Sequence, residues 1–174
     1  ALPEGTIDPM LQTVGFHGRD GRKRVACHYY ATHPMSFYRD GRVTSDFCGL
    51  ARKRLQAEDP GCTHLYFTGC AGNISAGKYN DGSPAARLAL TERIYDGMVA
   101  ASVNGKPQPL AEVDWRIDEV LPPPTSSPTE AELVAAISDP QRPLVERLLP
   151  AYRVGWMRRF AGGTPLVLSR LRLN

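Results

Sequence analysis

The stretch that decides the fold is residues 63–77, which read THLYFTGCAGNISAG. Residues 63–68 are, apart from His64, β-branched, aromatic or leucine, which is typical of a short buried strand. Residues 69–77 are mostly Gly, Ala, Ser and Asn, and Ser83-Pro84 then provide the N-cap and first residue of a helix. A strand, a tight loop and a helix in this order predict one unit of an α/β layer.

The preceding residues extend this pattern. Residues 11–16 and 24–32 read as two strands joined by a hairpin, because Gly18 and Asp20-Gly21 lie between them. A helix is expected from the possible N-caps at residues 44–46 to about Glu58, since apolar side chains recur there on one helical face. We therefore predict the α/β class, a layered mixed sheet with flanking helices.

A second part of the chain begins after Asn104-Gly105, so we expect an α/β core segment over 1–105 and a further segment over 106–174. The second segment reads as a strand, a Pro-rich linker, two helices and a last strand, all of the same domain. Ser127 and Glu130 have the spacing of a capping box for the first of these helices. The sequence stops inside the last strand-like run, so we expect the fold to be an incomplete part of a larger catalytic domain.

The composition excludes several classes of protein. Of 174 residues, 42% are hydrophobic and 22% charged, as in an ordinary globular domain. The net charge is only +3 and both signs alternate along the chain, which argues against a nucleic-acid partner. No apolar run approaches the ~20 residues of a transmembrane segment. The four cysteines form no Cys-x-x-Cys pair, and we interpret them as small buried hydrophobic residues whose redox state is open.

One candidate functional residue is His33, which is followed by Pro34 at the expected end of a strand. Pro cannot continue a ladder, so the chain leaves the sheet here, at an edge where α/β proteins place ligands. As a metal ligand His33 would need one ring nitrogen held by an acceptor and the other free. The alternative is a buried histidine satisfied by a backbone carbonyl.

The second candidate region is the loop that surrounds Asn73 and Ser75. Small residues such as Gly72 let a backbone approach a ligand closely, and a serine on such a loop can be a nucleophile or a hydrogen-bond donor. The alternative is a tight turn with Asn73 in the left-handed region. Lys78 and Tyr79 follow and could face a small, charged substrate, or lie in a solvated loop before Ser83.

Three short motifs in order resemble the neutral/alkaline non-lysosomal ceramidase superfamily. They are His-Pro-Met-Ser at 33–36, Thr-Ser-Asp-Phe-Cys-Gly at 44–49 and Tyr-Phe-Thr-Gly-Cys-Ala-Gly-Asn-Ile-Ser at 66–75. In that family a strand ends in His-Pro-Thr-Ser, a Ser-Gly-Asp stretch opens a helix, and a later strand leads into Gly-Asp-Val-Ser. Asn73 stands where the family usually has Asp.

The resemblance implies a zinc-dependent amide hydrolase. His33 would be one zinc ligand, and Ser75 would lie at the catalytic centre with Asn73 beside it. Gly72, Lys78 and Tyr79 would contact a small-molecule or lipid amide, with N-acylsphingosine as the substrate of the best-known members. The resemblance also implies a secreted or periplasmic location.

The chain lacks the other zinc ligands of that family. Catalytic zinc takes three protein ligands and a water, so we expect missing chain segments or a partner chain to complete the site, and the 174 residues alone to be inactive. Two other functions stay open from the sequence: a non-catalytic structural or binding segment without metal, and a metal-independent serine hydrolase with His33 as the base of Ser75.

Overall fold

A computed structural model describes residues 5–38 and 40–174. The chain divides into two compact units, the first ending at residue 108 and the second beginning at Pro109. The predicted fold class is confirmed, because the structure is mixed α/β with two small sheets and flanking helices. None of the helices in the described part is both long and apolar enough to cross a membrane.

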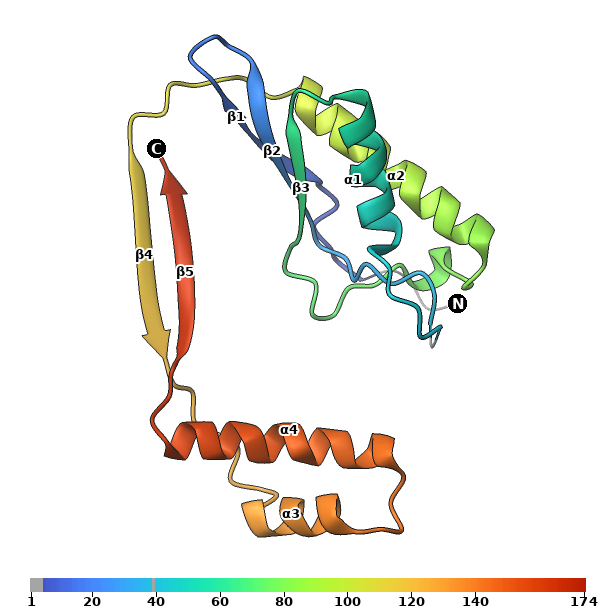
Figure 1. Cartoon of the computed structure of the whole chain (residues 1–174), viewed down its shortest axis with the longest axis vertical. Helices are drawn as coiled ribbons and strands as arrows, with labels where there is room; N and C mark the ends of the chain where they lie inside the picture. Colours follow the sequence, from blue (N-terminus) through green and yellow to red (C-terminus); the bar gives the residue numbers. More distant parts are fainter. Residues whose placement is uncertain (1–4, 39) are drawn as a thin grey trace. The chain divides into compact units, whose positions relative to one another are not determined.

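The first unit is built on a three-stranded sheet (Figure 1). Strands β1 (Gln12–His17) and β2 (Lys23–Tyr30) form the expected antiparallel hairpin. Strand β3 (Thr63–Thr68) pairs in parallel with β2, after the crossover helix α1 (Asp46–Glu58). Because β2 and β3 are parallel, both strands end at the same edge of the sheet.

Two helices cover one face of this sheet. α1 packs against α2 (Pro84–Val103), and a short 3₁₀ turn, η1 (Gly77–Tyr79), precedes α2. Ser83 caps α2 as predicted, since its hydroxyl accepts from the Ala86 amide at 3.1 Å. The buried core between the helices consists of Phe47, Cys48, Ala51, Leu55, Ala76, Leu90, Ile94 and Met98.

The cysteines are all free. Three of them are buried, as expected of small hydrophobic residues, whereas Cys70 is exposed. Burial raises the pKa of Cys48 to about 12, so this thiol stays protonated and unreactive at neutral pH.

The second unit contains a two-stranded antiparallel sheet and two helices. Its elements are β4 (Val113–Val120), α3 (Glu130–Ser138), α4 (Leu144–Ala161) and β5 (Leu166–Leu173).

The predicted capping box of α3 is wrong by two residues. Thr129, not Ser127, is the N-cap, and its partner is Glu132 rather than Glu130. The Glu132 carboxylate accepts from both the Thr129 amide (2.7 Å) and its hydroxyl (2.8 Å). The same Ser/Thr-x-x-Glu spacing occurs twice in overlapping positions, and the pattern alone does not choose between them.

Candidate functional site

The candidate site lies at the edge where β2 and β3 end. The loop that follows β2 carries His33, and the loop that follows β3 carries Asn73 and Ser75. The two loops leave the sheet together because the Gly69 amide donates to the Tyr30 carbonyl at 2.9 Å. This parallel-strand edge therefore brings residues about forty positions apart in sequence onto neighbouring loops.

His33 is held against the second loop by two hydrogen bonds to one atom. Its backbone amide donates to the Ile74 carbonyl at 3.0 Å, and its ring Nδ1 lies 2.8 Å from the same oxygen. A carbonyl oxygen only accepts, so Nδ1 carries the proton and the neutral ring keeps its lone pair on Nε2. The alternative of a buried histidine satisfied by a backbone carbonyl is therefore wrong about burial, because the side chain is exposed, although the backbone carbonyl is present.

Ser75 and Asn73 flank the carbonyl that holds His33, and both side chains are exposed. Asn73 does not adopt the left-handed conformation that the alternative interpretation required. Within the described residues no hydrogen bond joins Ser75 to His33, so the geometry gives no direct support to a serine–histidine pair.

A left-handed conformation occurs instead at Asp46, with φ of 50° at the start of α1. Its buried carboxylate accepts from the Ser36 amide at 2.9 Å, from the Ser36 hydroxyl and from the Phe47 amide. The Asn80 side chain donates to the Ser36 carbonyl at 3.0 Å. The serine of the His-Pro-Met-Ser motif and the aspartate of the next motif therefore fix the loop that carries His33.

Ser75 also lines a mainly apolar cavity of about 500 Å³ in the first unit. Ile74, Leu90 and Ile94 contribute apolar walls, and Tyr79 adds an aromatic one. Of the predicted substrate residues, Tyr79 lines the cavity, whereas Gly72 and Lys78 are not among its described lining residues.

Arg93 was not predicted from the sequence, yet it lines the same cavity and places its guanidinium 4.9 Å from the Tyr79 ring centre. The signal was present in the helix pattern. Arg93 falls three residues after Leu90 and four before Gly97, on the stripe of α2 that is otherwise apolar or small. Charged side chains are almost never fully buried without a partner, so a charged residue on such a stripe indicates that this part of the helix faces a cavity or solvent and not the hydrophobic core.

Only one of the expected zinc ligands is present at this site. His33 has the ring geometry that a ligand requires, with Nδ1 held and Nε2 free. Within the described residues, however, His33 belongs to no group of three His, Cys, Asp or Glu side chains that could hold a metal. The described residues thus fit zinc at His33 only as one ligand of an incomplete set.

Comparison with known proteins places this geometry in a fold class. No family profile matches the chain, and no curated protein matches it. Among solved structures the fold resembles ceramidases. A ceramidase complexed with C2 superposes with a TM-score of 0.57 and 17% identity, covering 66% of this chain and 20% of that one.

The second of these structures is the neutral ceramidase from Pseudomonas aeruginosa, with a TM-score of 0.53 and 16% identity. The match covers 63% of this chain and 19% of that one. The chain thus spans about a fifth of the length of either protein. The similarity shows a shared fold, and it agrees with the resemblance that the three motifs indicated.

Proposed function

We propose that this chain carries part of the active site of a zinc-dependent amide hydrolase of the neutral ceramidase type. His33 binds the metal through Nε2, and Ser75 lies at the catalytic centre with Asn73 beside it. The observation that carries the proposal is the double hydrogen bond from His33 to the Ile74 carbonyl. It orients a free imidazole nitrogen next to the loop that presents Ser75.

Zinc bound at such a site lowers the pKa of a coordinated water and polarises an amide carbonyl. The residues of this chain do the positioning. The Ile74 carbonyl fixes the ring and tautomer of His33, and the Asp46–Ser36 hydrogen bonds fix the loop. The Ser75 hydroxyl holds the attacking water or the scissile amide, or attacks as the nucleophile.

The remaining ligands come from missing chain segments or a partner chain, because His33 is a single ligand and catalytic zinc needs three. We therefore expect the 174 residues in isolation to lack turnover.

The cavity beside Ser75 supports an N-acyl substrate. Its apolar walls suit a hydrocarbon chain, and Tyr79 and Arg93 provide polar groups for the head of the molecule. Its volume lies in the range of ligand pockets. A linear amide with an apolar acyl chain fits this arrangement better than a small charged substrate.

The test measures zinc content and hydrolysis of N-acylsphingosine in the longest native polypeptide that contains this chain. We expect about one zinc per chain at this site, lost in His33→Ala, and turnover lowered by at least about a hundredfold in Ser75→Ala. His33→Asn is the sharper variant, because the Asn amide can still donate to the Ile74 carbonyl but offers no Nε2. It should keep the fold and lose this zinc.

The matched controls are His17→Ala and Ser169→Ala, which replace exposed residues outside the site. Both should leave zinc and turnover unchanged. Full activity in Ser75→Ala, or unchanged zinc at this site in both His33 variants, would contradict the proposal. Loss of turnover in the Ser75 variant with no metal present, together with a trapped acyl-enzyme, would instead establish the metal-independent serine hydrolase.

A further inference from the structure

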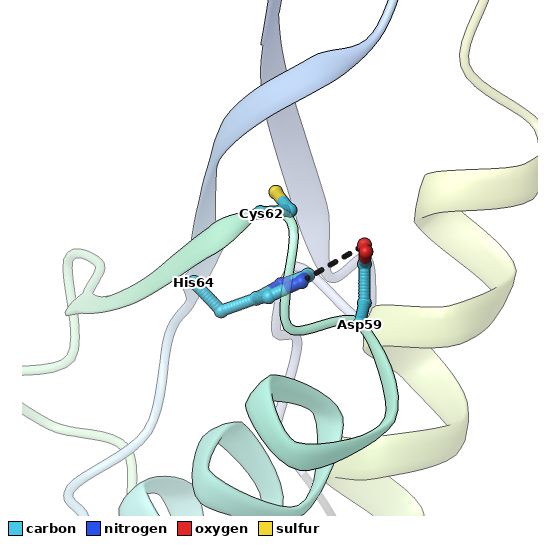
Figure 2. Close-up of side chains that lie close together, drawn as sticks. All are labelled: Asp59, Cys62 and His64. Carbon is cyan, nitrogen blue, oxygen red and sulfur yellow. Dashed lines mark hydrogen bonds and ion pairs between the residues drawn. The ribbon is translucent and has the colours of Figure 1, made fainter.

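A second group of metal-ligating side chains lies at the other end of β3, where the strand begins. Asp59 follows α1, Cys62 lies in the turn, and His64 is in the strand (Figure 2). One ligand atom from each lies within 4.8 Å of the other two. Cys62 and His64 are each 1% exposed, whereas Asp59 opens this group to solvent.

We propose that Asp59, Cys62 and His64 bind a thiophilic divalent cation, Zn²⁺, through a carboxylate oxygen, Sγ and Nε2, with water in the fourth position. The set of one sulfur, one imidazole nitrogen and one oxygen suits tetrahedral zinc and disfavours Ca²⁺ and Mg²⁺. This site does not include His33, and the proposal does not depend on whether the chain belongs to an amide hydrolase.

The ring of His64 is oriented by a buried chain of hydrogen bonds. Its Nδ1 lies 3.0 Å from Nε2 of His28, whose own Nδ1 lies 2.8 Å from the Thr13 hydroxyl. Both rings are buried, and their planes are nearly parallel, with an interplanar angle of 4° and ring centres 5.3 Å apart. Metal-binding histidines are characteristically held through their second nitrogen in this way.

One distance between two of these ligand atoms already matches that of a bound ion. His64 Nε2 lies 3.3 Å from Asp59 Oδ2, and two zinc ligands at about 2.0–2.1 Å from the metal are about 3.4 Å apart in a tetrahedron. The Cys62 sulfur has only a weak contact, at 3.8 Å, with the Thr63 carbonyl. The three ligand atoms lie within 4.8 Å of one another, so binding requires the sulfur to move closer to the other two.

The protons balance without charging either histidine. A carboxylate only accepts, so with both rings neutral and no metal bound, His64 Nε2–H donates to Asp59, His28 Nε2–H donates to His64, and the Thr13 hydroxyl donates to His28. When Nε2 of His64 binds the ion, both rings carry their proton on Nδ1, and the Thr13 oxygen becomes the acceptor. Only the Cys62 thiol loses a proton, so about one proton leaves per ion bound.

Lys23 competes with the cation. Its ammonium group lies 3.4 Å from the Asp59 carboxylate and pairs with the oxygen that also contacts His64. A metal ion must displace this ammonium group or bind against its charge. Lys23→Met, which keeps the length and removes the charge, should therefore tighten binding severalfold.

The experiment titrates Co²⁺ into the reduced chain and records the thiolate-to-cobalt charge-transfer band and the visible bands of tetrahedral cobalt. We expect one equivalent to give both, and Zn²⁺ to displace it. Cys62→Ser should abolish the charge-transfer band, whereas Cys70→Ser and His33→Ala should leave it unchanged. No charge-transfer band in the wild-type chain, or one that survives Cys62→Ser, would overturn the proposal.

A second pair of variants avoids the ligands themselves, in case Cys62→Ser does not fold. Thr13→Val removes the acceptor for His28 and should weaken Co²⁺ binding by about tenfold or more, whereas Thr13→Ser should bind like the wild type. Equal affinity in all three chains would contradict the role of the buried hydrogen-bond chain. Because His33 is intact in these variants, failure of this site leaves the proposed hydrolase site untouched.

Discussion

Two histidines lie at opposite ends of the parallel pair β2–β3, and each has its ring oriented by a contact at Nδ1, but the contacting group differs. His33 is exposed, and a main-chain carbonyl holds its Nδ1. His64 is buried, and the side chain of His28 holds its Nδ1. In each arrangement one ring nitrogen is held, and the other is the one that we propose as a metal ligand.

The difference lies in what each arrangement requires of the fold. A main-chain carbonyl can hold the ring of His33 wherever the two loops leave the sheet side by side. The residues of the two loops therefore largely determine this arrangement. A side-chain partner inside the sheet requires the register of three strands, because Thr13 faces His28 across β1–β2 and His64 lies diagonally across β2–β3. We therefore expect His33 to matter mainly for chemistry and His64 also for stability.

The largest expected difference is in the free energy of unfolding of the alanine variants. His64→Ala should lose about 4 kcal/mol, because it leaves a cavity and removes the partner of His28. His33→Ala should lose less than about 1 kcal/mol, because the site is exposed to water. Urea unfolding of both variants in the presence of a chelator measures this, and equal losses would remove the distinction between the two histidines.

The next effect is a loss of stability in acid, again measured without metal. Burial, and then the nearby charges of His64 and Lys23, lower the pKa of His28 from 6.5 to about 4. The unfolded chain therefore binds more protons between these values. The contribution of His28 to the free energy of unfolding is fully present above about pH 6.5, and it falls by about 3 kcal/mol as the pH drops toward 4.

Burial also lowers the pKa of His64, although Asp59 opposes the shift, so His64 adds to the acid effect in the same direction. Urea midpoints at several pH values measure the combined slope. His28→Gln should flatten it, and an unchanged slope in that variant would assign the acid sensitivity to other groups.

A smaller effect is expected at the far end of the buried chain. Thr13→Val should cost about 1–2 kcal/mol of stability, because it leaves Nδ1 of His28 without its partner. Thr13→Ser keeps the hydroxyl and should retain most of the stability. Thermal unfolding of the two variants separates the hydrogen bond from the packing of the methyl group, because Val keeps the methyl group and Ser keeps the hydroxyl. A larger loss in Thr13→Ser than in Thr13→Val would show that the methyl group, and not the hydrogen bond, accounts for the stability.

The smallest effect concerns the tether of His33. His33→Asn can keep the side-chain bond to the Ile74 carbonyl and should unfold within a few tenths of a kcal/mol of the wild type. His33→Ala keeps only the backbone bond, so the amide of residue 33 should exchange its hydrogen faster in this variant. Identical exchange rates would show that the ring does not fix the loop.

Local signals predicted most of the first unit. The helix that begins at Ser83-Pro84 and the hairpin around Gly21 depend on residues adjacent in sequence, and both are found where expected. The approach of His33 and Ser75 follows from the shared end of two parallel strands. These features need no knowledge of side-chain packing.

Features that depend on register were not predicted. His64 was expected at the start of a strand and was given no role. Its partner His28 lies thirty-six residues earlier in the sequence, and the two side chains come together only through the pairing of β2 with β3. The left-handed conformation that the alternative interpretation gave to Asn73 occurs instead at Asp46, where three hydrogen bonds to one carboxylate hold it. A polar residue on the buried face of a short strand was the signal for His28.

Ile74 combines two roles in different parts of one residue. Its main-chain oxygen holds His33, and its side chain forms part of the cavity wall beside Ser75. Exchange of the side chain for Val, Leu or Met reshapes the cavity, while the oxygen stays in place whatever the residue. A single substitution at Ile74 could therefore change the size of the molecule that the cavity admits during evolution. The orientation of His33 would be kept throughout.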